Sequence, residues 1–457
     1  MPVPQNSPRL DRTSLRDDVY RRLREDIVAG VYLPGERLRE SMIEARMGAS
    51  RTPVREALSR LDADGFVDVL PQRETRVRDV GSQEICDAII VLRHVFGTQV
   101  QLAVESHDAA MLERIRAYHA LIVEDLLAEA RAIAEGDALG ELLDAFLGVA
   151  GNPTLQRAVR AIALHLRWYA NTTPGLATHL GVGAARVADM LSACERGDVE
   201  RVRGLFDAWF AQVLRVLAEP APVRVAAEFP KSLVKPRQLL REQVYVVLLD
   251  ALRRTEFASG ERLREDQLLS WLGVSRVPLR DALGRLELIG LVETLPGRMT
   301  RVAVLDVDQL SWVMSALGVF AGLAMRLGVP KICVEDIAQV RLARARLDEA
   351  LAAEDVIEGI AAVIDALMVV VDASENQSLV TILLSLTPWI YRRTQLRPAP
   401  DLRLLDDVLA GLEDGIDRRD AGAAARAVVA YFDQVAVRVG RATPVIMVDD
   451  AGVRTDE

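Results

Sequence analysis

The sequence predicts a mainly α-helical protein built from two tandem copies of one unit, and three observations support this. Half of the 457 residues are hydrophobic and only 5% are aromatic, while Ala, Leu and Arg, which favour helices, are abundant. Residues 50–58 recur 225 positions later as residues 275–283. Apolar residues follow helical spacing in the long regions after each copy. The repeat is too long for a solenoid and indicates duplication of a whole domain pair.

The repeated segment has the features of a short amphipathic helix. Ser50 stands at the N-cap position, where a hydroxyl can accept a hydrogen bond from a free backbone amide. Pro53 follows in the first turn, where a missing N–H costs little. Gly65 is placed to end the helix. The apolar stripe is formed by Val54, Leu58 and Leu61.

One face of this helix carries residues suited to contact DNA. Arg51 and Arg55 stand four residues apart near the N-terminus, with Thr52 beside them. Arg276 and Arg280 are the counterparts in the second copy. Arginines can bind guanine edges or phosphates, and a helix N-terminus favours phosphate. A surface helix with solvated arginines would have the same pattern, so the flanking segments must decide between the two interpretations.

The flanking segments complete a winged helix-turn-helix. Apolar spacing predicts a helix over 15–27, closed by Gly30, and a short second helix over 39–47. Two short helices joined by three or four residues form a helix-turn-helix. Alternation over 66–70 and 75–77 around a polar turn predicts a β-hairpin. The second copy repeats this arrangement without a gap, which favours DNA binding over a surface helix with solvated arginines.

Arginines of each predicted hairpin suit contacts to the DNA backbone or minor groove. They lie at the hairpin tip and on its return strand. The four residues are Arg73 and Arg76 in the first copy and Arg298 and Arg301 in the second.

The predicted domain boundaries follow from these modules and from proline-rich stretches. They are a disordered tail at 1–13, a winged helix-turn-helix domain at 14–80, a helical domain at 81–217, a linker at 218–236, a second winged helix-turn-helix domain at 237–304, a second helical domain at 305–441 and a tail at 442–457. In the first helical domain, helices are expected near 82–105, 109–135, 138–150, 153–173, 183–195 and 198–217.

The charge distribution favours a selective DNA-binding protein. The net charge of −10 argues against a protein that coats nucleic acid indiscriminately. Residues 9–80 and 231–305, however, carry more basic than acidic side chains. Basic modules therefore alternate with acidic regions.

Cysteine usage and apolar runs favour a cytoplasmic protein without a membrane partner. Cys86, Cys194 and Cys333 form no CxxC pair, which favours free thiols in a reducing compartment. The first residues do not have the pattern of a signal peptide. The most apolar run, 361–371, is too short to cross a bilayer.

The repeated motif resembles the GntR family of bacterial repressors. The resemblance rests on the order helix, Pro-Gly-Glu-Arg turn, Ser-Arg-Thr-Pro-Val-Arg-Glu-Ala-Leu, Asp-Gly-Phe-Val and hairpin. It implies that Arg51, Thr52, Arg55, Arg276 and Arg280 contact double-stranded operator DNA. It also favours a repressor.

Two departures from the family pattern affect the predicted contacts. Thr52 becomes Val277 in the second copy, so we expect stronger contacts to the first half-site. The usual glycine at the wing tip is Glu74 in the first copy and Met299 in the second. These replacements make close approach of the wing backbone to DNA doubtful.

The helical regions resemble the all-α FadR/FCD-type effector domain, which usually holds a metal through one Asp and three His. In this sequence the corresponding positions are Leu139, Leu143, Val187 and Trp209 in the first copy, and Val363, Leu367, Leu409 and Tyr431 in the second. The histidines are His94, His107, His119, His165 and His179. None pairs at helical spacing or stands at a family ligand position. The sequence therefore predicts no metal and no cofactor.

A small-molecule effector remains compatible with these domains. Arg93 matches an arginine often present on the first FCD helix and could face a carboxylate, with a counterpart near Met314 in the second copy. Polar-aromatic clusters around His165 and Trp389 favour interface or packing roles over pocket lining.

The sequence as a whole favours a DNA-binding regulator in which one chain acts as a pseudo-dimer on an imperfect palindrome. Helix-turn-helix dimers contact half-sites about 34 Å apart or a multiple of it. Further self-association stays open. The alternative is a metabolite-binding or scaffold protein whose winged helices no longer recognise sequence. No glycine-rich phosphate loop, nucleophile elbow or His-Glu metal pair supports an enzyme.

Overall fold

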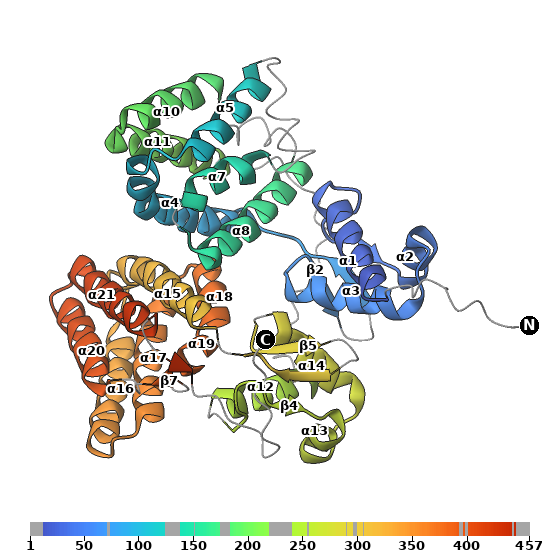
Figure 1. Cartoon of the computed structure of the whole chain (residues 1–457), viewed down its shortest axis with the longest axis vertical. Coiled ribbons are helices and arrows are strands. Elements are labelled where there is room, and N and C mark those ends of the chain that lie inside the picture. Colours follow the sequence, from blue (N-terminus) through green and yellow to red (C-terminus); the bar gives the residue numbers. More distant parts are fainter. Residues whose placement is uncertain are drawn as a thin grey trace, which may run out of the picture.

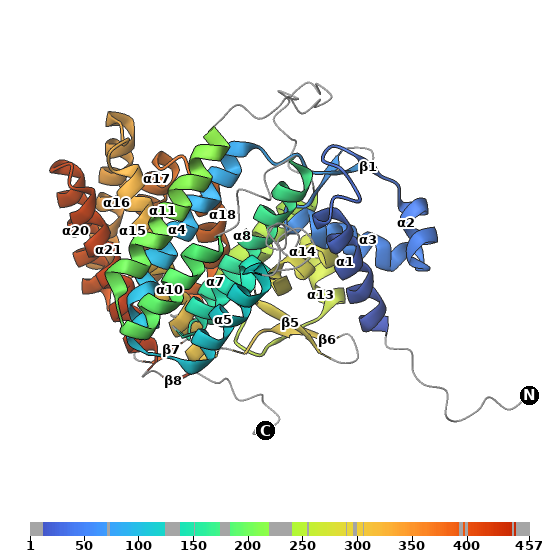
Figure 2. The ribbon, with the colours of Figure 1, turned by 90° about the horizontal axis from the view of Figure 1, so that it is seen from above.

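The computed structural model describes most of the chain as two small winged-helix domains beside two helical bundles (Figure 1). The described residues are 12–70, 74–123, 138–149, 151–173, 183–218, 240–253, 256–288, 290–295, 299–304, 306–392, 396–397, 401–440 and 443–444. Most of the predicted tails and linker lies outside these ranges. Seen from above, both winged-helix domains lie on the same side of the bundles (Figure 2).

The two winged-helix domains have the same element order. The first contains α1 (Arg12–Val28), β1 (Arg37–Leu38), α2 (Glu40–Met47), α3 (Arg51–Ala63), β2 (Val67–Leu70) and β3 (Glu74–Val77). The second contains α12 (Leu240–Arg253), β4 (Arg262–Leu263), α13 (Glu265–Leu272), α14 (Arg276–Leu288), β5 (Val292–Leu295) and β6 (Met299–Val302). Their antiparallel sheets have the orders β1-β3-β2 and β4-β6-β5. The predicted hairpins are confirmed, whereas the short first strand of each sheet was not predicted.

The start of α1 and the cap of α3 differ from expectation. Helix α1 begins at Arg12, inside the segment predicted as a tail. Ser50 is at the N-cap of α3 in extended conformation, but its side chain makes no capping hydrogen bond. Gly65 ends α3 as predicted, with φ +77°, because an amide in the left-handed conformation can return to the last helical carbonyls. Its N–H donates to Asp62 O at 3.2 Å.

Each helical domain is a bundle that follows its winged helix. The first contains α4 (Ser82–Glu105), α5 (Ala109–Val123), α7 (Ala138–Val149), α8 (Pro153–Thr172), α10 (Ala184–Arg196) and α11 (Val199–Ala218). The second contains α15 (Val307–Gly328), α16 (Val334–Ala352), α17 (Val356–Ala373), α18 (Gln377–Leu386), α19 (Pro388–Arg392), α20 (Leu402–Asp417) and α21 (Ala421–Val439). The end of the helix expected over 109–135 lies outside the described residues.

The second bundle departs from the first in two places. Helix α8 is continuous, whereas the equivalent stretch is divided into α18 and α19 at Pro388, because proline cannot continue a helical hydrogen-bond ladder. Strand β7 (Leu396–Arg397) pairs antiparallel with β8 (Thr443–Pro444). The expectation of an all-α domain with a tail from residue 442 was therefore incomplete.

Helix α15 is the one described helix that is long and apolar enough to cross a membrane. Sixty-seven per cent of its apolar stretch is buried inside the fold. It packs along α21 and forms the core of the second bundle. Its apolar surface is therefore accounted for by packing.

Reciprocal hydrogen bonds relate the two bundles. Asn152 Nδ2 donates to Trp312 O at 3.0 Å, and Asn376 Nδ2 donates to Asp87 O at 3.1 Å. These are the same contact made from each side, because the donors and the acceptors correspond in the repeat. His94 hydrogen-bonds the backbone of Val319, its own counterpart 225 residues later. Such pairing is the pattern of an isologous interface around a twofold axis.

Candidate nucleic-acid interface

Helix α3 buries one face in its domain and presents the other to solvent. Val54 and Leu61 are fully buried and Leu58 is 3% exposed, which confirms the predicted apolar stripe. Arg51 and Thr52 are exposed, and Arg55 is partly exposed. The sequence-predicted DNA-contacting residues of the first copy therefore share one accessible surface at the N-terminal end of the helix.

Helix α1 holds α3 in place through polar and aromatic contacts. Tyr20 Oη donates a hydrogen bond to Asp64, and Arg60 Nη1 lies 2.6 Å from Asp17 Oδ1. The Arg60 guanidinium also stacks 4.0 Å from the centre of the Tyr20 ring. In the second copy Arg285 lies at the same distance over Tyr245. These contacts fix the orientation of the exposed face, because a stacked and hydrogen-bonded guanidinium has few alternative positions.

Glu40, the first residue of α2, holds both arginines of the exposed face. Its carboxylate accepts from Arg51 Nε at 2.8 Å and from Arg55 Nε at 3.0 Å. Burial raises the pKa of Glu40, but the two arginines outweigh burial and leave the pKa below its ordinary value. Glu40 is therefore an anion that competes with DNA for the same guanidinium groups. Sequence reasoning missed this residue, since its partners lie 11 and 15 positions away.

In the second copy, Glu265 stands in the place of Glu40 and holds its arginine partner at longer distances. Arg280 donates to Glu265 at 3.2 and 3.1 Å. Arg276 is exposed, and within the described part of the chain Glu265 pairs with Arg280 and not with Arg276. The side chain of Val277 lies outside the described set.

The wing arginines with described positions point back into their own domains. Arg76 donates to Gly35 O at 3.0 Å and forms an ion pair with Glu74. Arg301 Nε donates to Glu293 Oε1 at 2.7 Å. Arg73 and Arg298 lie outside the described residues. DNA contacts by the wings stay a prediction, and for Arg76 and Arg301 they would require exchange of these partners.

Helices α3 and α14 contact each other. Ser59 Oγ donates to Asp281 Oδ1 at 2.8 Å, which joins α3 to α14. From the helical rise per residue and the spacing of packed helices, the Cα atoms of Arg51 and Arg276 lie at most about 30 Å apart. This separation is shorter than the ~34 Å of one DNA turn expected from sequence.

Four of the family metal positions hold buried apolar side chains. Leu143, Val187 and Leu409 are fully buried, and Trp209 is 1% exposed. The core of the first bundle is closed by ring contacts of Phe96, Phe146, Phe206 and Phe210. Among the described residues, no group of three His, Cys, Asp or Glu side chains is placed to hold a metal ion.

Arg93, the predicted effector residue, lies on the surface of the first bundle. Its Nε donates to Asp207 Oδ1 at 2.7 Å, and both side chains are about half exposed. Helices α4 and α15 start 225 residues apart, so its counterpart is Gly318 and not Met314. The Gly318 position packs against Phe432 of α21, which leaves no space for an equivalent arginine.

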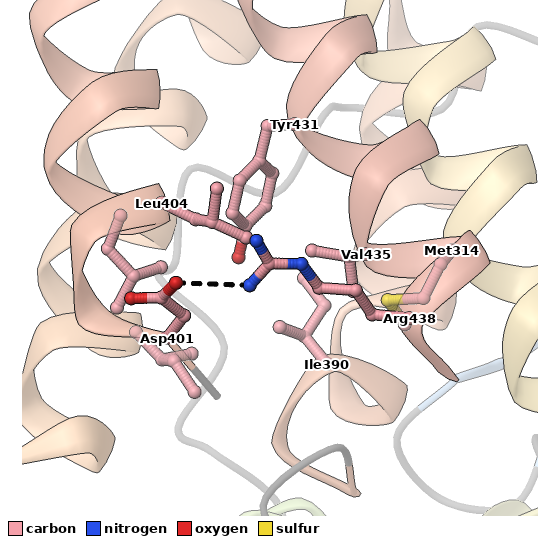
Figure 3. Close-up of a pocket in the computed structure, with 9 residues that line it drawn as sticks. Met314, Ile390, Asp401, Leu404, Tyr431, Val435 and Arg438 are labelled. Atoms are coloured by element: carbon pink, nitrogen blue, oxygen red, sulfur yellow. Dashed lines mark hydrogen bonds and ion pairs between the residues drawn. The ribbon is translucent and has the colours of Figure 1, made fainter. Parts of the chain in front are cut away.

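A small cavity lies in the second bundle (Figure 3). Its volume is about 20 Å³, enough for a water molecule. Arg438 and Asp401 form an ion pair of 3.1 Å at this cavity. The Arg438 hydrogen bond and one from the Arg403 backbone lower the pKa of Asp401. The remaining lining residues are Met314, Ile360, Ile390, Leu404, Leu405, Tyr431 and Val435.

The helix-turn-helix, the three-stranded wing and the exposed basic helix define two winged-helix DNA-binding domains. Residues 15–77 and 240–302 match the family described as bacterial regulatory proteins, gntR family. The matched segments run from α1 to β3 and from α12 to β6. The two winged-helix domains belong to the gntR family.

Known relatives match this chain over part of their length. The HTH-type transcriptional repressor GlaR of Escherichia coli K12 is 37% identical over 87 residues, which are 19% of this chain and 40% of GlaR. The HTH-type transcriptional repressor RspR of the same organism is 29% identical over 104 residues, 23% of this chain and 43% of RspR. The chain thus spans less than half the length of these relatives.

A solved structure from Rhodococcus sp. RHA1, described as a GntR transcriptional regulator, is 23% identical. The similarity covers 45% of this chain and 97% of that chain, with a TM-score of 0.40.

Proposed function

We propose that the protein is a sequence-specific DNA-binding transcriptional regulator in which one chain provides both halves of a pseudo-dimer. The observation that carries the proposal is the exposed face of α3, formed by Arg51, Thr52 and Arg55. A similar face recurs on α14 with Arg276 and Arg280. Both faces belong to gntR-family domains, and the relatives GlaR and RspR are named as repressors.

The reciprocal contacts between the bundles support the pseudo-dimer. The donor amides of Asn152 and Asn376 each reach the other unit's first bundle helix. Ser59 and Asp281 join α3 and α14, the two helices that we propose as the recognition helices. A covalent chain also gives the second winged helix a high effective concentration once the first is bound. We therefore propose an imperfect palindrome as the operator, with unequal half-sites because Thr52 and Val277 differ.

A small-molecule effector is the regulatory part of the proposal, in helical domains of FCD type. Arg93 is a weak candidate for its anchor, because Asp207 already occupies its guanidinium. The cavity at Arg438 is no better developed as an anchor, because Asp401 pairs with this guanidinium and the cavity has room for about one water molecule.

The direct test of DNA recognition is selection of random duplexes by the purified chain, followed by binding measurements on the enriched site. Arg51→Ala or Arg55→Ala should cost ~1–3 kcal/mol of specific binding if each makes a bidentate base contact. Arg21→Ala, a change of equal charge on the exposed surface of α1, is the matched control. Weak binding to all duplexes, with no enriched site, would favour the scaffold alternative.

A further inference from the structure

We propose that His165 and Trp389 position the two recognition helices on their bundles, and that Trp389 couples α14 to the cavity of the second bundle. The inference rests on the proposed DNA-binding function and specifies how that site is regulated. It predicts that the two halves of the operator respond differently to changes inside the bundles.

In the first unit, His165 of α8 packs against the C-terminal end of α3. Its ring stacks on Phe66 with centroids 4.5 Å apart and an interplanar angle of 15°. Its Nε2 atom lies 3.6 Å from the position that a Cβ on Gly65 would occupy. Trp168, one turn further along α8, adds a second ring contact to Phe66 at 5.5 Å.

Helix α8 also reaches α1, the other helix that holds the recognition helix. Asn171 Nδ2 donates to Val28 O at 2.8 Å, at the last residue of α1. Contacts at two separate points fix both the position and the angle of a rigid domain. The first winged helix is thus docked on a continuous 20-residue helix.

In the second unit, Trp389 of α19 takes the place of His165. Its Cζ2 atom lies 2.9 Å from the position that a Cβ on Gly290 would occupy. Gly290 follows α14 with φ +74°, as Gly65 follows α3. The Trp389 side chain is 5% exposed. His165 and Trp389 therefore fill equivalent positions, at the glycines that follow α3 and α14. We call each of these positions a slot.

The slot lies at the end of each recognition helix opposite to the arginines. A displacement at this end tilts the helix and moves the arginine end, because a two-turn to four-turn helix behaves as a rigid rod. His165 and Trp389 are positioning residues in this sense, since they lie behind the helices and away from the predicted DNA surface.

The second slot adjoins the cavity of the second bundle. Ile390, the neighbour of Trp389 on α19, lines the cavity together with Met314 and Arg438 (Figure 3). Helix α19 has five residues and is separated from α18 by Pro388, so it can shift without moving a long helix. The equivalent region of the first bundle is filled by Trp209 and the phenylalanine cluster. A change of packing at the cavity should therefore reach α14 and not α3.

The first experiment measures binding to two duplexes derived from the enriched site, each with one half-site scrambled. Trp389→Ala should weaken binding at the second half-site about 3- to 30-fold and leave the first unchanged. His165→Ala should do the opposite. Trp389→Phe should keep the binding that Trp389→Ala loses. His165→Trp, which introduces the residue type of the other copy, should likewise keep the binding that His165→Ala loses. Thermal unfolding of each variant shows whether the fold is kept.

The second experiment changes the cavity without touching α19. Leu404→Phe fills the cavity from α20 and should alter the affinity of the second half-site alone. Leu347→Phe, a buried substitution between α16 and α17, is the control for general overpacking and should not separate the half-sites. Leu404→Met provides a milder filling if the phenylalanine variant fails to fold.

Equal effects of the slot variants on both half-sites, or no effect in folded variants, would overturn the positioning role. Equal effects of Leu404→Phe and Leu347→Phe would overturn the coupling to the cavity. Absence of any enriched site for the unmodified chain would instead contradict the proposed DNA-binding function, so the two failures are distinguishable.

Discussion

At the residue scale, Glu40 forms ion pairs with the arginines that we propose contact DNA. Arg51 and Arg55 both donate to this one carboxylate. Binding to a phosphate or guanine must therefore break or share these bonds. The pair holds the guanidinium groups in a defined position in the free protein, and it places a negative charge near the predicted DNA surface.

We expect Glu40→Gln to raise the affinity for non-specific DNA and to reduce the preference for the enriched site. Loss of the carboxylate removes repulsion from phosphates and frees the arginines, so the slope of log K against log salt should become steeper by up to about 1. Salt titrations on specific and random duplexes measure both effects. Glu44→Gln, the same charge change one turn along α2, is the control. Equal behaviour of the two variants would contradict a special role for Glu40.

His94 lies between α4 and α15, where burial first, and then the charge of Arg326, lower its pKa to about 4. In the unfolded chain the pKa is near 6.5. Between these values the unfolded chain binds the proton and the folded chain does not. The free energy of unfolding should therefore fall as pH drops from about 6.5 to 4, by up to about 3 kcal/mol from this residue.

His94→Gln should remove that part of the pH dependence, because glutamine cannot gain the charge. Urea unfolding of both proteins between pH 4 and 7 gives the difference. The comparison must be between the two proteins, since burial also lowers the pKa of His165 and contributes in the same direction. Parallel pH profiles for the variant and the unmodified chain would contradict the assignment.

The main residues of the basic face could be predicted from sequence, but their partners could not. Arg51, Thr52 and Arg55 follow from helical spacing within one short segment. Glu40 lies in another helix, and its contact with the arginines depends on how two helices pack. For the same reason, sequence reasoning placed the effector residue at Arg93, while the structure has the cavity in the other bundle.

At the element scale, one asparagine in each unit links a helix cap to the interface between bundles. Asn152 Oδ1 accepts from Thr154 N and Leu155 N at the start of α8, while its Nδ2 donates to Trp312 O. Asn376 does the same for α18 and Asp87 O. Both side chains are buried.

Asn152→Asp and Asn376→Asp should each destabilise the chain, because aspartate keeps the cap but loses the donor to the other unit. Loss of this hydrogen bond, with a carboxylate oxygen now facing the carbonyl oxygen, should cost about 1–3 kcal/mol. Asn376→Asp should cost more, because the new carboxylate would lie close to the Asp87 carboxylate, which accepts from the neighbouring Gln377 N. The two negative charges would repel each other. Chemical unfolding measures the loss. Unchanged stability of Asn152→Asp would show that the contact between bundles contributes nothing.

Sequence patterns located the long elements well and the short ones poorly. The helices of the first bundle follow from apolar periodicity and from breaks such as Asn152-Pro153. The strands β1 and β4 have two residues each, too few for any alternation to be visible. The division of α18 from α19 follows from Pro388 only after the two copies are compared.

At the scale of the whole molecule, duplication has given two units with the same fold and different interiors. The first bundle is closed by aromatic side chains, and the second keeps a cavity with an Arg438–Asp401 pair. The bundles are joined by reciprocal contacts and the recognition helices by Ser59 and Asp281. This arrangement corresponds to a dimer whose two halves can accumulate different substitutions, because each half is encoded by its own segment of the chain.

The contact between α3 and α14 bears on the operator. In this arrangement the two basic faces are closer than one DNA turn, so we expect half-sites whose centres are separated by less than ~34 Å. The spacing in the enriched site checks this expectation. Half-sites one full turn or more apart would mean that the winged helices separate from each other before they bind.

The central claim is that one chain supplies both halves of the DNA-binding unit. The most direct test is the mass of the complex formed between the purified chain and a duplex that carries the enriched site, measured by native mass spectrometry or analytical ultracentrifugation. The account predicts one chain per duplex, with both half-sites needed for full affinity. Two chains per duplex, each bound through one winged helix, would contradict it.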